Sequence, residues 1–189
     1  MRGGRPPIPF VPLPSAPRSV HRWAFWGFMV ALFMLTPDIL KPAGWSFLDG
    51  VDLIFHEAGH LIFMPFGETY YLMGGSLFQV LLPFALAGVF FWRGEGVSAA
   101  VVMLWAAQNL GNVSVYIADA QERALPLLGG DPDHHDWWQI LEAWNALPLC
   151  TSLGRGVWFL GVTVALLAVW IAYRAAWTED RTATPGQRS

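Results

Sequence analysis

Residues 97–118 read VSAAVVMLWAAQNLGNVSVYIA, a stretch of 22 residues without a charged side chain. At about 1.5 Å per residue, a helix of this length can cross roughly 30 Å of hydrocarbon. The whole chain has a matching composition, because 54% of its 189 residues are hydrophobic and 13% are charged. Soluble domains carry about 25% charged residues. The sequence therefore predicts an all-α, polytopic membrane helix bundle in an integral membrane protein.

Four other apolar stretches predict the remaining helices of this bundle. Residues 23–35 predict the first, although Thr36-Pro37-Asp38 interrupts it. A cleavable signal peptide is the alternative, which we disfavour because no small-residue cleavage site follows and the preceding tail is long. The other three stretches are residues 51–64, 77–92 and 156–173. The chain is therefore expected to have four to five membrane helices.

The polar parts of the chain define its organisation. Residues 1–22 hold six prolines and four arginines, and residues 177–189 are polar, so we expect two disordered tails around a bundle at residues 23–176. Within the bundle, residues 119–155 form the longest polar segment, with an amphipathic helix expected from Trp137 to Leu147. No basic block indicates nucleic acid as a partner. A single cysteine leaves no internal disulfide and no cysteine zinc cluster.

The stretch at residues 51–64, with Asp49 as a candidate cap, is short for a membrane crossing. Its fourteen residues reach about 21 Å, so we expect a re-entrant helix that penetrates without crossing. If the other four helices cross, the arginine-bearing tails and the turn at residues 93–96 share the cytoplasmic side, and the acidic segment 119–155 lies outside. Five full crossings are the alternative, and they would place the two tails on opposite sides.

The short helix carries the sequence FHEAGH at residues 55–60. His56 and His60 are four residues apart, so both lie on one face of a helix and can grip one zinc ion. Glu57 lies about 100° round the helix from His56, where it can take a proton from a zinc-activated water. Such residues in an apolar helix cost several kcal/mol unless paired, which favours a functional site. The alternative is a hydrogen-bonded trio that faces a polar bundle interior.

A catalytic zinc site has three protein ligands and a water, so the two histidines need a third partner. The expected source is DPDHHDW at residues 131–137. We rank His135 first, Asp136 second and His134 third, with Asp119 and Glu122 as weaker candidates. The alternative is a solvated acidic loop in which Asp136 is the N-cap of the helix that begins near Trp137.

Several uncharged polar residues fall at the expected membrane depth. They are the amides Gln79, Gln108, Asn109 and Asn112. Hydrogen bonding between helices is one interpretation, and the lining of a wet cavity that holds a substrate backbone is the other. The stretch Met73-Gly74-Gly75-Ser76 predicts a flexible start to the helix at residues 77–92 and an edge for an extended peptide.

The run at residues 55–60 in an apolar helix resembles the site-2-protease (M50) class of intramembrane zinc metalloproteases, over about residues 51–64. The resemblance implies cleavage of peptide bonds in or near the bilayer, with His56 and His60 as zinc ligands and Glu57 as the catalytic base. It also implies an aspartate ligand from a later helix. Here the Asp-Gly pair at Asp49 precedes the histidines, so no ligand is transferred to Asp49.

A closer likeness is to small bacterial membrane proteins that share this motif, a following Gly-Gly-Ser-Leu-X-Gln and a later His-Asp-Trp. Residues 74–79 and 135–137 match these patterns, and the likeness spans about residues 50–140. It implies His135 or Asp136 as the third ligand and a location in the bacterial inner (plasma) membrane, but it implies no reaction.

Three functions fit these observations. The first is an integral membrane zinc metallohydrolase, an intramembrane peptidase surrounded by lipid that acts on a membrane protein or peptide. The second is a metal-binding transporter or sensor without hydrolysis, and the third is a structural partner of a membrane complex. A transporter needs ligands along a route, whereas this chain concentrates them around one motif that includes Glu57. This favours the first function.

Overall fold

The computed structural model describes residues 18–42, 46–128 and 130–177, and its regular elements are all helical. The helices are α1 (Arg18–Leu40), α2 (Phe47–Phe63), α3 (Glu68–Trp92), α4 (Gly96–Ala118), α5 (Asp136–Ala143) and α6 (Cys150–Trp177). Short 3-10 turns are η1 (Met64–Phe66), η2 (Pro132–His134) and η3 (Leu147–Leu149). The predicted all-α class is confirmed for the described residues. The two expected tails lie almost wholly outside these residues.

Four of the described helices are long and apolar enough to cross a membrane. These stretches are Arg22–Leu40, Glu68–Trp92, Gly96–Ala118 and Leu147–Trp177. The motif-bearing helix α2 has 17 residues and is not one of them. The helix lengths therefore agree with the four-crossing arrangement, in which α2 penetrates without crossing.

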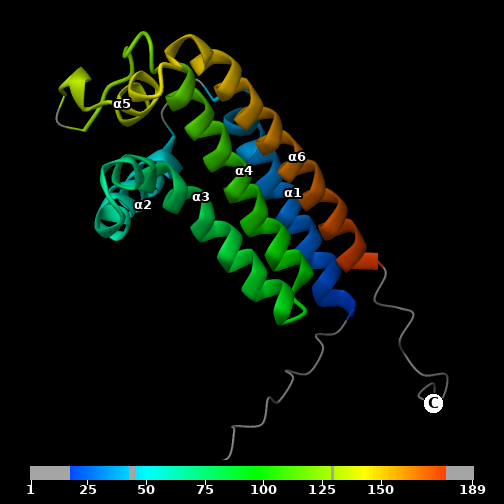
Figure 1. Cartoon of the computed structure of the whole chain (residues 1–189). Helices are drawn as coiled ribbons and strands as arrows, with labels where there is room; N and C mark the ends of the chain where they lie inside the picture. Colours follow the sequence, from blue (N-terminus) through cyan, green and yellow to red (C-terminus); the bar gives the residue numbers. More distant parts are fainter. Residues whose placement is uncertain (1–17, 43–45, 129, 178–189) are drawn as a thin grey trace, which may run out of the picture.

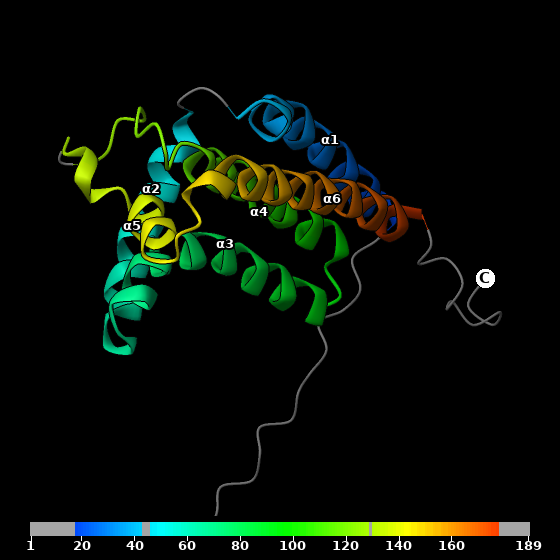
Figure 2. The ribbon, with the colours of Figure 1, turned by 45° about the horizontal axis from the view of Figure 1, so that its top comes forward.

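The four long helices run alongside one another, and α2 and α5 lie together at one end of the bundle (Figures 1 and 2). Helix α4 packs against α1, α3 and α6, and alanines fill much of the contact. On α6, Gly154 and Gly161 lie so close to α4 that an added Cβ would come within about 3 Å of its backbone carbonyls. Small residues at helix contacts allow this close approach. The tight bundle provides a rigid frame for the elements at its end.

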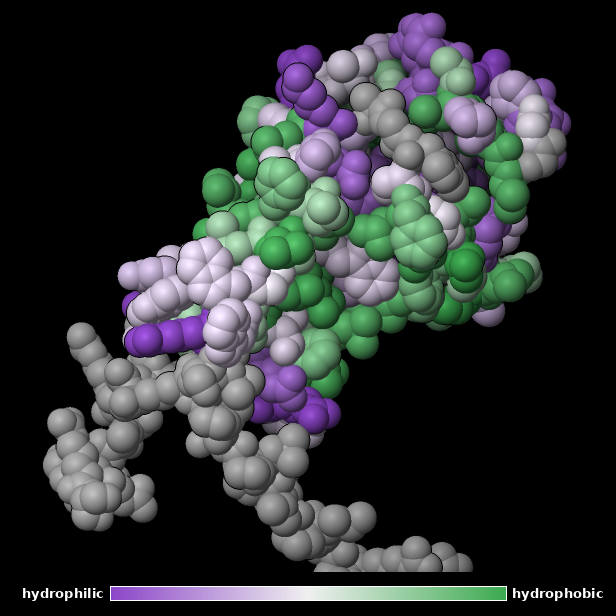
Figure 3. Space-filling view, turned by 180° about the vertical axis from the view of Figure 1, so that it is seen from behind, coloured by the Kyte–Doolittle hydropathy of each residue, from purple (hydrophilic) through white to green (hydrophobic). Residues whose placement is uncertain are grey.

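On the face drawn in Figure 3, hydrophilic residues gather toward the two ends of the bundle and hydrophobic residues dominate between them. The start of α1, the α3–α4 turn and the end of α6 share one end (Figure 1), and they carry Arg22, Arg93 and Arg174. The opposite end carries Lys41, Arg123 and Arg155 together with the acidic residues Asp119, Glu122, Asp131, Asp133 and Asp136. Lysine and arginine are thus present at both ends in nearly equal numbers in the described part of the chain, and the acidic residues named here gather at the end that carries α5.

Helix α2 starts earlier than predicted, and Asp49 is not its N-cap. Ser46 is the N-cap, and its hydroxyl accepts a hydrogen bond from the Asp49 N–H while the Asp49 carboxylate accepts one from the Ser46 N–H. This reciprocal pair is a capping box. The helix ends at Phe63, before Pro65 and Gly67. Gly67 has a φ of 102°, a backbone conformation that glycine adopts easily because it has no side chain.

Several other predicted boundaries are wrong. Helix α1 runs through Pro37 to Leu40, because one proline removes only one helical N–H, and the Thr36 hydroxyl donates to the Leu32 carbonyl in the preceding turn. Helix α3 begins at Glu68, so the Gly74-Gly75 pair lies inside a helix and does not form a flexible edge. Helix α5 is shorter than expected and α6 is longer at both ends.

Membrane topology gives the first testable prediction. Single cysteines introduced as Glu95→Cys and Asp133→Cys in a Cys150→Ala background should react with an impermeant thiol reagent from opposite sides of the membrane. Glu95 lies at the α3–α4 turn and Asp133 in η2, at opposite ends of the bundle. Labelling of both from one side would contradict the crossing arrangement.

Candidate metal site

Helices α2 and α3 meet at glycines, and this contact positions the motif. A Cβ on Gly59 would collide with the Gly74 carbonyl, and one on Gly74 would collide with α2 in return. At the next position, a Cβ on Gly75 would lie 2.5 Å from His56 Nε2. The Gly-Gly pair therefore lets α3 approach closely and leaves room for the His56 ring.

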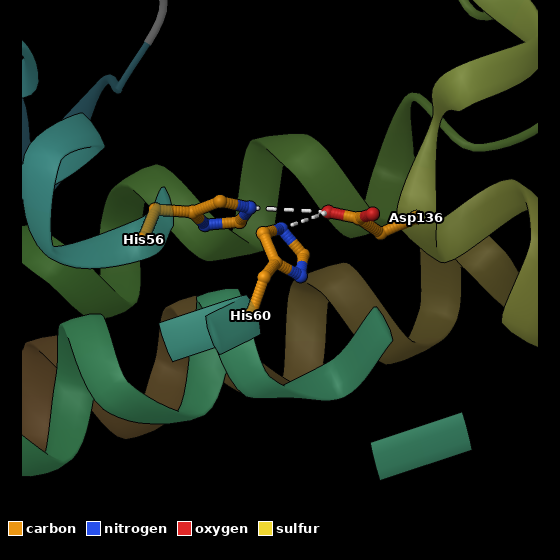
Figure 4. A group of neighbouring side chains, drawn as sticks. All are labelled: His56, His60 and Asp136. Atoms are coloured by element: carbon orange, nitrogen blue, oxygen red, sulfur yellow. Dashed lines mark hydrogen bonds and ion pairs between the residues drawn. The ribbon is translucent and has the colours of Figure 1, made fainter. Parts of the chain in front are cut away.

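Two histidines of α2 and one aspartate of α5 converge on a single point (Figure 4). His56 Nε2 lies 3.1 Å from Asp136 Oδ2, and His60 Nε2 lies 3.3 Å from the same oxygen. All three side chains are buried, and their ligand atoms lie within 4.8 Å of one another. Two imidazole nitrogens and a carboxylate oxygen so close together can hold a metal ion.

The far side of each imidazole ring is held by an oxygen. His56 Nδ1 lies 3.0 Å from Gln79 Oε1, and His60 Nδ1 lies 2.7 Å from the Tyr71 carbonyl oxygen. An amide or carbonyl oxygen can only accept, so each Nδ1 carries the hydrogen. Both Nε2 atoms are therefore directed at Asp136, which is the arrangement that oriented metal ligands usually show.

Asp136 is fixed by α3 and α4 as well as by its own helix. The Tyr116 hydroxyl donates to Asp136 Oδ2 at 3.2 Å and accepts the Asp136 backbone N–H at 3.0 Å. Next along the chain, Trp137 Nε1 donates to the Ser76 hydroxyl on α3. Burial raises the pKa of Asp136, but the His56 and His60 rings that face its carboxylate outweigh this effect and bring that pKa to about 2. Asp136 is therefore a carboxylate at neutral pH.

The other two predicted third ligands, His135 and His134, do not converge with His56 and His60. His135 is the N-cap of α5, since its Nδ1 accepts the Trp138 N–H, and its Nε2 lies 3.4 Å from Asp119 Oδ2. Burial lowers the pKa of His135, against the effect of the Asp119 carboxylate. His134 is exposed and pairs with Asp131. The structure thus brings Asp136 to the histidines, while His135 has the capping role that was the alternative prediction for Asp136.

Glu57 lies on a cavity of about 590 Å³ beside the three converging side chains. Its side chain is exposed, in contrast to those of His56, His60 and Asp136, which also line the cavity. The remaining wall is mixed. It includes the apolar residues Leu53, Leu72 and Val115 and the segment Leu125–Leu128. The site therefore combines buried candidate ligands with an accessible carboxylate and space for a ligand.

The four amides expected at membrane depth form an internal network between α2, α3 and α4. Gln79, Gln108 and Asn112 line the cavity, and Asn109 is fully buried and bonds to Asp52. Hydrogen bonding between helices is thus confirmed. Three of the four amides also line a cavity, and the binding of a substrate backbone there stays a prediction. The contributions of Tyr71 and Tyr116 to the site were not predicted, because a tyrosine near a helix end has no distinguishing sequence pattern.

The residues present could hold a metal ion. Two Nε2 atoms with their hydrogens on Nδ1, together with an ionised carboxylate oxygen, supply three ligands of the types that zinc takes in catalytic sites. If the three side chains had only a structural role, a proton alone would lie between the two Nε2 atoms and the carboxylate. No protein family, curated protein or solved structure matches the chain.

Proposed function

We propose that the chain is a membrane-embedded zinc hydrolase of the peptidase type. One observation carries the proposal: His56, His60 and Asp136 converge within 4.8 Å on a cavity that the motif glutamate, Glu57, also lines. Three protein ligands with an adjacent accessible carboxylate are the parts of a hydrolytic zinc site.

The role of each residue follows from its place. His56, His60 and Asp136 would hold the ion, which when bound supplies Lewis acidity and lowers the pKa of water to about 7. Glu57 accepts a proton on its carboxylate from water in the cavity and then donates it to the leaving amine. The buried histidines and aspartate have fixed partners, so the movable carboxylate is the one suited to proton transfer.

The charges of the cavity favour an amide over a phosphate ester as substrate. Four of the described lining residues are acidic (Asp38, Asp49, Glu57 and Asp136), and no lysine or arginine is among them. In addition to a metal ion, a site for a phosphate group normally provides cationic side chains or a helix N-terminus to bind the anionic oxygens. A neutral peptide bond needs neither, and the apolar wall suits a peptide from a membrane segment.

The alternative of a transporter is less well supported. In the described part of the chain, His56, His60 and Asp136 form the one group of three or more such ligands within reach of each other. A transport route needs successive sites. The concentration of ligands beside Glu57 therefore favours hydrolysis over conduction of a metal.

The proposal is tested with purified full-length protein in lipid vesicles and a library of membrane-spanning peptides, read by mass spectrometry. We expect new peptide termini that disappear after chelation and return when zinc is added back. Cleavage that persists in the chelated protein would contradict a zinc hydrolase, and so would the absence of any cleavage by zinc-loaded protein.

A further inference from the structure

A continuous line of hydrogen bonds leads from His56 to a buried carboxylate at the start of the same helix. His56 Nδ1 lies 3.0 Å from Gln79 Oε1 on α3, and Gln79 Nε2 donates to Asn112 Oδ1 on α4 at 2.9 Å. Asn112 Nδ2 then donates to Asp49 Oδ1 at 3.0 Å. The line thus passes through α3 and α4 and returns to α2, two turns before His56.

The carboxylate sets the direction of every bond in this line. An ionised carboxylate only accepts, so the Asn112 amide must turn its N–H toward Asp49 and its oxygen toward Gln79. The Gln79 amide must then present its N–H to Asn112 and its oxygen to His56. That oxygen accepts a hydrogen from His56 Nδ1, which leaves Nε2 for the ligand position. A reversed amide at either step would direct an N–H at Nδ1.

We propose that Asp49 is a positioning residue for the zinc ligand His56, acting through Asn112 and Gln79. This proposal rests on the proposed function because it names zinc as the ion that His56 binds. The orientation of the His56 ring can be measured without metal. Outer partners that orient a ligating histidine typically contribute about 10- to 100-fold to metal affinity. The cavity wall at Asp49 and Asn112 is therefore part of the candidate site, although neither residue reaches the ion position.

The chain offers matched controls for both residues. Asp52 lies one turn further along α2, is fully buried, and accepts hydrogen bonds from Trp105 and Asn109 on α4. Asp49 and Asp52 thus both join α2 to α4 through a buried carboxylate, and Asn112 and Asn109 are the corresponding amides of α4. The line to His56 uses Asp49 and Asn112.

The first experiment measures zinc affinity by chelator competition in the full-length protein. Asp49→Ala and Asn112→Ala should each weaken zinc binding about 10- to 100-fold, while Asp52→Ala and Asn109→Ala should stay within about threefold of the parent protein. Asn112→Ala leaves the capping box of α2 intact, so its loss of affinity cannot come from a frayed helix start. Equal affinities for the members of each pair would overturn the proposal.

A second variant distinguishes positioning from damage to the fold. Gln79→Glu places a carboxylate directly against His56 Nδ1, where it can only accept, and with Asp49 removed the Asn112 amide can turn to donate to it. The double variant Asp49→Ala/Gln79→Glu should therefore bind zinc within about threefold of the parent protein. If the double variant bound zinc no more tightly than Asp49→Ala alone, the proposal would be contradicted, because a carboxylate at position 79 would then fail to replace the line of hydrogen bonds from Asp49.

A third measurement separates this inference from the proposed function. The chain has five histidines, so nitrogen NMR of protein labelled at histidine can report the tautomer of each ring in metal-free Asp136→Ala protein, in which no carboxylate faces His56 Nε2. At a pH where the rings are neutral, His56 should carry its hydrogen on Nδ1, and Asn112→Ala should produce a mixture. His60, held by the Tyr71 carbonyl, should not change. If the parent protein binds no zinc, the proposed function fails. Independently, an unchanged His56 tautomer in Asn112→Ala would contradict the positioning role of Asp49.

Discussion

Protein carrying Glu57→Gln should retain about one zinc ion per chain and lose about 10²- to 10⁴-fold in the rate of peptide cleavage. The substitution removes the proton acceptor at the cavity but leaves His56, His60 and Asp136 unchanged. Glu57 is exposed, so the amide is not expected to disturb packing. The measurement is cleavage rate per zinc-loaded chain, with metal content determined on the same sample.

The matched control for Glu57 is Glu68→Gln. Glu68 is an exposed carboxylate at the start of α3 and does not line the cavity. It should change neither zinc content nor rate. Undiminished cleavage by the Glu57→Gln protein would show that Glu57 is not the base and would remove the main argument for a peptidase.

The second large effect is expected where the structure and the ranking from sequence differ. Asp136→Ala should weaken zinc binding by more than about 100-fold, because it removes a ligand and not an outer partner. His135→Ala should keep zinc binding within about tenfold, because the His135 ring caps α5 and faces Asp119. His135→Ala should instead lower the free energy of unfolding by about 1 kcal/mol, as the loss of an N-cap typically does.

Both variants are compared in one chelator competition series, with helix content followed by circular dichroism. The opposite order, in which His135→Ala loses zinc and Asp136→Ala retains it, would identify His135 as the third ligand. It would also mean that α5 turns when the ion binds.

The helical class and the motif helix were predictable, because they depend on local composition and on spacing along one helix. The boundaries were less so. Pro37 and the pair Gly74-Gly75 indicated breaks, yet both lie within long helices whose packing outweighs the local preference. The packing of α2 against α3 requires these glycines, because Gly74 allows α2 to approach closely and Gly75 leaves room for the His56 ring.

The third partner could be narrowed only to a segment. His134, His135 and Asp136 are adjacent, and the choice among them depends on where α5 begins. A start at Asp136 makes His135 the cap and turns Asp136 toward Tyr116 and the two histidines. The local preference points the other way, because aspartate is a favoured N-cap residue and histidine is not.

The line from Asp49 to His56 was beyond prediction for a different reason. Gln79 and Asn112 were recognised as polar residues at membrane depth, but their partners depend on the relative height of α2, α3 and α4. That height is set by close contacts such as Gly59 against Gly74, which involve residues distant in sequence. Local patterns therefore identified the amides and not their connection.

The central claim is that His56, His60 and Asp136 hold one zinc ion, and metal analysis of purified full-length protein tests it most directly. The parent protein, after removal of loosely bound metal, should contain about one zinc per chain, and His60→Ala, purified in parallel, should contain almost none. A parent protein without zinc, or a His60→Ala protein that keeps a full equivalent, would contradict the account.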